Sequence, residues 1–113
     1  MKHYKILKEI QKSFHFVNPH DDSRVDEKVF IKAIKFLLNI IEKMKRDPEN
    51  FKIVVLDPRN IVIKFIGNNY KLRIDVNEGK ISWTCEVKDV IDFRKEQIGT
   101  NSSDLIRWLN KHY

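Results

Sequence analysis

The sequence predicts an α+β domain in which two N-terminal helices, a four-stranded antiparallel meander and one or two C-terminal helices follow in the order ααββββαα. Apolar and polar residues alternate through residues 51–87, as they do in half-buried strands. Three turn signals divide this stretch, and apolar residues at steps of three and four flank it on both sides. We therefore expect the helices to lie mainly on one face of the sheet, and residues 1–113 to form a single domain.

The last two strands of the meander have the most regular pattern. Every second residue is apolar in residues 70–76 and again in residues 81–87. Clusters of turn-forming residues separate the four strands: Asp57, Pro58, Arg59 and Asn60; Gly67, Asn68 and Asn69; and Asn77, Glu78 and Gly79. The predicted strands are therefore residues 51–56, 61–66, 70–76 and 81–87.

Matching the apolar faces of these strands predicts their register, because a slip of one residue would turn every side chain over. The register places Ile53 opposite Ile63, and Ile74 between Ile63 and Trp83. Two rows of outward-facing residues follow from it: Lys52, Lys64, Arg73 and Thr84 in the first, and Val54, Val62, Asp75 and Ser82 in the second.

Helical spacing appears on both sides of the meander. Residues 3–17 and residues 23–46 are predicted as the two N-terminal helices, and the second has an apolar surface wide enough to contact both the sheet and the first helix. Residues 88–97 are predicted as a short helix closed by Gly99. A last helix is expected to carry on one face Leu105, Trp108, Leu109 and His112.

The charge balance favours an anionic partner. The chain has 22 Lys and Arg against 16 Asp and Glu, a net charge of +6 and a pI near 9.5. Residues 1–50 hold 11 basic and 8 acidic residues, and residues 51–113 hold the same numbers, so each part carries +3. Only the folded arrangement can therefore concentrate the charge against nucleic acid, an anionic membrane or an acidic protein.

The sequence also predicts a location. No apolar run is long enough to span a bilayer, and the N-terminus is a charged amphipathic segment without the apolar centre of a signal peptide. The single cysteine, Cys85, falls on the inward side of its strand and is interpreted as a buried apolar filler. We expect a cytoplasmic protein, and the sequence leaves its oligomeric state open.

Asp75, followed by Glu86 and Lys88, resembles the Asp, then Glu-x-Lys, signature of restriction-endonuclease-like nucleases, preceded here by helices as in that fold. The resemblance implies that the two carboxylates hold a divalent metal ion while the lysine assists the attacking water. In the predicted register, however, Asp75 faces Ser82. Glu86 faces Lys71 instead, which leaves the carboxylates about 13 Å apart along the strands, too far for one metal. We therefore favour a protein that is not an enzyme, with Glu86 as the cross-strand partner of Lys71.

Lys52, Lys64 and Arg73 are three like charges opposite one another, which is destabilising by itself. Two interpretations are open: the long side chains splay apart in solvent with Asp75 and Glu86 neutralising them, or an anionic partner relieves the repulsion. The predicted outward face has no aromatic residue on which a base can stack, and it offers a small apolar patch beside the charges. The candidate binding residues are Lys52, Lys64, Lys71, Arg73, Val54 and Val62.

These features predict a small non-catalytic protein that binds another macromolecule, in the manner of an inhibitor, an immunity or anti-defence protein, or a regulatory adaptor. An acidic protein is the expected partner, and no cofactor or metal is implied. Two alternatives stay open. The first is a DNA- or RNA-binding protein that tolerates any sequence, and the second is a metal-dependent nuclease with a degenerate motif.

Overall fold

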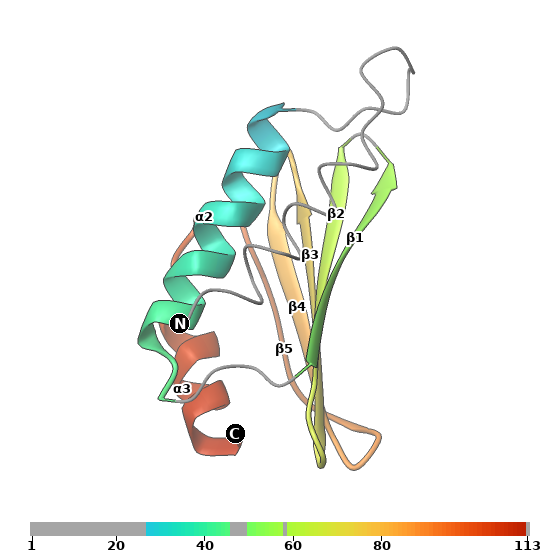
Figure 1. The fold of residues 1–113 in the computed structure, drawn as a ribbon, viewed down its shortest axis with the longest axis vertical. Coiled ribbons are helices and arrows are strands. Elements are labelled where there is room, and N and C mark those ends of the chain that lie inside the picture. Colours follow the sequence, from blue (N-terminus) through green and yellow to red (C-terminus); the bar gives the residue numbers. More distant parts are fainter. Residues whose placement is uncertain (1–26, 46–49, 58, 113) are drawn as a thin grey trace.

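The computed structural model describes residues 27–45, 50–57 and 59–112 of the 113-residue chain. In these residues, two helices cover one face of a five-stranded antiparallel sheet (Figure 1). The elements are α2 (Glu27–Lys43), β1 (Asn50–Asp57), β2 (Asn60–Ile66), β3 (Tyr70–Asn77), β4 (Ile81–Val87), β5 (Val90–Gln97) and α3 (Ser103–His112). The predicted α+β class is confirmed, but the sheet has five strands and not four.

The two predicted N-terminal helices lie wholly or partly outside the residues that the structure describes. The helix predicted over residues 3–17 and the start of the helix predicted over residues 23–46 lie outside the described residues. Within the described residues, the second helix is confirmed as α2, which ends at Lys43. Among the residues that the structure describes, no helix has the length and apolar character needed to cross a membrane.

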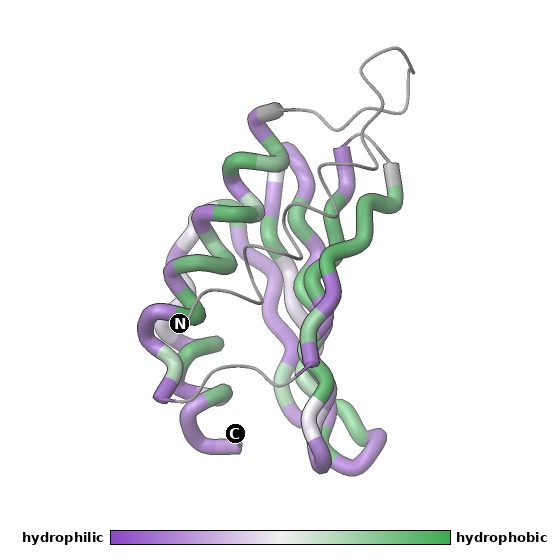
Figure 2. The backbone as a smooth tube through the Cα atoms, in the orientation of Figure 1, coloured by the Kyte–Doolittle hydropathy of each residue, from purple (hydrophilic) through white to green (hydrophobic). Residues whose placement is uncertain are grey.

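The strands lie side by side in chain order, and the predicted register of the first four is confirmed. Ile53 pairs with Ile63, and Ile74 pairs with Ile63 on one side and with Trp83 on the other. These side chains face α2 and are buried. Hydrophobic residues dominate β1 and alternate with hydrophilic residues along β3 (Figure 2).

The short helix predicted over residues 88–97 is wrong, because this segment forms the edge strand β5. Val87 pairs with Val90, so only Lys88 and Asp89 connect β4 to β5. Both residues have positive φ angles, 52° and 66°, as in the type I′ turns that suit the twist of a hairpin. Neither residue is glycine or asparagine, and the sequence therefore contains no strong signal for this turn.

A β-bulge also interrupts the alternation of inward- and outward-facing residues along β5. Cys85 pairs with Phe93, but the next residue, Glu86, pairs with Ile91, which leaves Asp92 as an extra residue. The extra residue interrupts the alternation of apolar and polar residues along the strand. Val87, Val90, Ile91 and Arg94 also fall at steps of three and four in the sequence, and this spacing indicates a helix.

The core lies between α2 and the inner face of the sheet. The ring of Phe36 on α2 stacks on Trp83 of β4, with 6.0 Å between the ring centroids and an interplanar angle of 29°. Both side chains are buried, and complete burial of an aromatic side chain of this kind stabilises a fold by about 1.5–3 kcal/mol. The described residues provide no hydrogen-bond partner for the buried indole N–H of Trp83.

The predicted C-terminal helix is confirmed as α3, which covers the part of the sheet near β5 and buries Leu105, Trp108 and Leu109. The Asn101 side-chain oxygen accepts a hydrogen bond from the Ser103 backbone N–H at the start of the helix, at 3.0 Å. The Trp108 indole N–H donates to the Asp92 carboxylate at 2.6 Å. The bulge in β5 thus places Asp92 where it anchors α3.

Candidate binding face of the sheet

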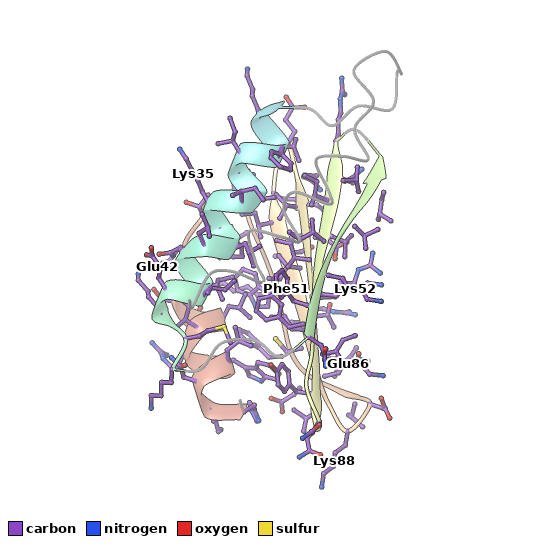
Figure 3. The ribbon with its side chains drawn as sticks, in the orientation of Figure 1. Lys35, Glu42, Phe51, Lys52, Glu86 and Lys88 are labelled. Atoms are coloured by element: carbon purple, nitrogen blue, oxygen red, sulfur yellow. The ribbon has the colours of Figure 1, made fainter. Side chains whose placement is uncertain are left out.

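The outer face is the side of the sheet opposite α2 and α3. Lys52 and Glu86 extend on this side, whereas Phe51, the neighbour of Lys52, lies on the helix side (Figure 3). Most outward positions are polar or charged, and no aromatic side chain belongs to the outer face of the described strands. The aromatic residues of β2, β3 and β4, which are Phe65, Tyr70 and Trp83, are buried on the inner face.

Four cations lie in one row across the outer face. Lys52 pairs with Lys64, and Lys64 pairs with Arg73, as the sequence predicts. Thr84 then separates Arg73 from a fourth cation, Arg94 of β5. Lys52, Lys64, Arg73 and Arg94 are referred to below as the basic row. At about 4.8 Å between strands, the row is about 19 Å long.

The sequence did not reveal Arg94 as a site residue, because a helix was predicted for its segment. Its position follows directly from the pairing of Thr84 with Arg94. A signal was nevertheless present, since Val90, Ile91 and Phe93 are residue types enriched in strands.

An acidic neighbour partly neutralises the middle of the basic row. Arg73 donates to Asp75 through Nη2 at 3.0 Å and through Nε at 3.1 Å, so the two residues form a two-point ion pair along β3. These hydrogen bonds and the charge of Asp75 raise the pKa of the Arg73 guanidinium above its usual value. The side chains of Lys52 and Lys64 make no ion pair or hydrogen bond with the described residues, nor does that of Arg94.

The apolar patch expected at Val54 and Val62 is only partly open. Their row continues as predicted through Asp75 and Ser82, and Glu96 of β5 extends it. Val62 is only 1% exposed although it points to the outer face, and Val54 is half-buried. Val62 therefore offers little surface to a partner.

A different apolar pair flanks the basic row on its other side. Ile66 pairs with Lys71, Lys71 with Glu86, and Glu86 with Ile91, which gives one row across four strands. Ile66 is 40% exposed and Ile91 is 51% exposed. Neither residue was singled out from the sequence. Ile91 was assigned to a helix, whereas the predicted register did place Ile66 on the outer face opposite Lys71, and this signal was not used.

Lys71 has a different ionic partner from the one expected. Glu86 stands opposite Lys71, as the register predicts. The ammonium group of Lys71 instead forms an ion pair with Asp89 of the β4–β5 turn, with 3.2 Å between Nζ and Oδ1. The backbone N–H of Lys88 in the same turn donates to the carbonyl of Asn69 at 3.1 Å. This bond joins the β4–β5 turn to the neighbouring β2–β3 turn.

The residues of the nuclease-like motif do not converge. Asp75 pairs with Ser82, and Glu86 stands four residues further along β4. At about 3.3 Å for each residue, the two carboxylates are separated by about 13 Å along the strands. Within residues 27–45, 50–57 and 59–112, no group of three or more His, Cys, Asp and Glu side chains is placed to hold a metal ion.

Cys85 is fully buried on the inner face, where its sequence pattern placed it. Burial, with a smaller effect from the charge of Asp92, raises the pKa of the Cys85 thiol to about 12. A thiol with this pKa is protonated at neutral pH, and nucleophilic chemistry requires the thiolate.

Comparison with protein-family models, with curated proteins and with solved structures found no match.

Proposed function

We propose that this protein is a non-catalytic binding protein that docks the outer face of its sheet on an acidic surface of another protein. The observation that carries the proposal is the cross-strand register of Lys52, Lys64, Arg73 and Arg94. Like charges on neighbouring strands repel one another, and the carboxylates of an acidic partner would attract these cations and offset their repulsion.

The surroundings of the basic row favour a protein partner. Exposed Ile66 and Ile91 lie in the adjacent row, and apolar groups beside charges are typical of protein interfaces. Asp75 occupies the two-donor edge of Arg73, which a carboxylate or a phosphate of a partner would otherwise use, so this ion pair does not distinguish the two kinds of partner. The exposed apolar pair is therefore the feature that favours a protein surface.

One observation favours nucleic acid as a second candidate. Arg94 extends the cations to nearly the full width of the sheet, and a row of about 19 Å can contact several phosphates at once. Such contacts would be independent of sequence, because the outer face of the described strands has no aromatic side chain for base stacking.

Affinity capture from the native host, performed with and without nuclease treatment, separates the two candidates. We expect a defined protein that remains bound after nuclease treatment. A partner that disappears after this treatment, together with binding of random DNA or RNA whose log K falls steeply with log salt, would replace the first candidate by the second. In that case Lys64→Gln should reduce the salt slope by about one unit.

A further inference from the structure

A second surface feature lies on the opposite side of the sheet from the basic row. A groove with a volume of about 470 Å³ runs beside α2 and extends to the connection between β5 and α3. The side chains that line it are Lys28, Ile31, Lys32, Lys35, Phe36, Asn39 and Thr100. Lys35 extends from α2 on the side of the molecule away from Lys52 (Figure 3). The groove is therefore independent of the outer face.

Three lysines give the groove its charge. Lys28, Lys32 and Lys35 are four and three positions apart, so they form one stripe about 10.5 Å long on α2. Among the residues that the structure describes, no acidic side chain lines the groove. Lys32 and Lys35 lie on neighbouring turns of the helix, where like charges repel one another, and a bound anion would reduce that repulsion.

The groove also has an apolar wall. Ile31 is 43% exposed, and Phe36 is buried beneath the same side of the helix. Phe36 is held in place by its stacking on Trp83. A ligand that carries an apolar ring or chain would cover Ile31 while its anionic group reaches the lysines.

Hydrogen bonds fix the facing wall. The Gln97 side-chain amide donates to the carbonyls of Gly99 at 2.8 Å and Asn101 at 2.7 Å, which folds the connection that carries Thr100. Asn39 of α2 donates to the Ser102 hydroxyl at 2.7 Å and ties the helix to that connection. The groove is thus built from two anchored elements and is preformed before a ligand binds.

One of the lysines is already oriented. Lys32 donates to the backbone carbonyl of Asn77 at the end of β3, at 3.2 Å. An ammonium group has three donor hydrogens, so this contact fixes the Lys32 side chain and leaves two donors for an anion.

We propose that this groove binds a small organic anion in which an apolar ring or chain carries a carboxylate, sulfonate or phosphate group. Its volume lies within the range of about 300–1,000 Å³ that is common for small-molecule sites. The hydrogen bond between Asn39 and Ser102 spans from α2 to the facing wall, which favours a short ligand over an extended peptide.

The dye 1-anilinonaphthalene-8-sulfonate has the required combination of an aromatic body and one anionic group, and it tests the proposal. We expect saturable 1:1 binding by calorimetry, with amide shifts in NMR spectra at Lys35, Asn39 and Thr100. Binding should weaken about tenfold in Lys35→Gln, which removes one charged contact, and in Ile31→Gln, which removes the apolar wall.

Two controls make this test specific. Lys43→Gln removes a lysine of the same helix that lies outside the groove, and it should change the affinity less than twofold. Neutral N-phenyl-1-naphthylamine should bind at least tenfold more weakly than the sulfonate. The proposal is overturned if no saturable binding occurs below about 1 mM, if Lys43→Gln is as damaging as Lys35→Gln, or if the neutral compound binds equally well.

Discussion

Arg73 and Asp75 lie two positions apart on β3 and form a two-point ion pair on the outer face, with 3.0 Å between Nη2 and Oδ1 and 3.1 Å between Nε and Oδ2. The pair places a carboxylate beside the middle of a row that otherwise consists of cations. Asp75 thus reduces the repulsion within the basic row of the free protein, and it also weakens the attraction of that row for an anionic partner.

Replacement of Asp75 by Asn should strengthen the binding of an acidic partner, because Arg73 then contributes its full charge. We expect an affinity gain of about threefold to tenfold at low salt, measured by calorimetry with the partner isolated by affinity capture. Asp104→Asn is the matched control, since Asp104 also forms an ion pair, with Lys95, but belongs to α3. An equal gain in both variants would mean that only the net charge matters.

Replacement of Gly67 by Ala should destabilise the fold by about 1–3 kcal/mol, measured by urea unfolding. A Cβ atom at Gly67 would overlap Cε1 of Tyr70, and the buried Tyr70 ring has little room to move. Gly99→Ala is the control, because a Cβ atom there meets no other atom within 4 Å. A Gly67→Ala variant as stable as Gly99→Ala would contradict the packing of Tyr70 on this turn.

Replacement of Trp83 by Ala should cost about 3–5 kcal/mol in the free energy of unfolding, because Trp83 fills the space between the sheet and Phe36. Trp83→Phe should cost less, since it keeps an aromatic ring and removes a buried N–H that has no partner among the described residues. A loss below about 1 kcal/mol for Trp83→Ala would show that the inner face is wrongly assigned.

The raised pKa of Cys85 predicts a loss of stability at high pH. The native protein holds the thiol proton up to a pKa of about 12, whereas a thiol in an unfolded chain loses it near pH 8.5. The contribution of Cys85 is therefore complete below about pH 8.5 and decreases as the pH rises towards 12.

Urea unfolding between about pH 7 and pH 10.5 should accordingly show a steeper alkaline decline in the native protein than in Cys85→Ala. The native thiol should also resist labelling at pH 8 until the protein unfolds. Labelling of the folded protein as fast as the unfolded chain would contradict the burial of Cys85.

The sequence predicted the register of the first four strands because each strand has one clearly apolar face, as Ile63 and Ile74 show. It missed β5 because the extra residue Asp92 breaks the alternation and the turn residues Lys88 and Asp89 are atypical. The residue types of one strand do not show a bulge, since a bulge is defined by the pairing of that strand with its neighbour.

The candidate site was predicted in part. The positions of Lys52, Lys64 and Arg73 followed from alternation alone, and the structure confirms their alignment. The ion pair between Arg73 and Asp75 and the burial of Val62 depend on side-chain conformations and three-dimensional packing, which alternation does not encode. The outward position of Ile66 followed from the predicted register, whereas that of Ile91 became recognisable only when β5 was placed beside β4.

The proposed function depends most directly on Lys64, which lies within the basic row and makes no ion pair with the described residues. Calorimetry with the captured partner should compare the native protein with Lys64→Glu and with Lys43→Glu, which makes the same change of charge on α2. We predict that Lys64→Glu weakens binding at least tenfold while Lys43→Glu changes it less than threefold. Equal affinities of the native protein and Lys64→Glu, or equal losses in both variants, would contradict the assignment of the outer face as the binding surface.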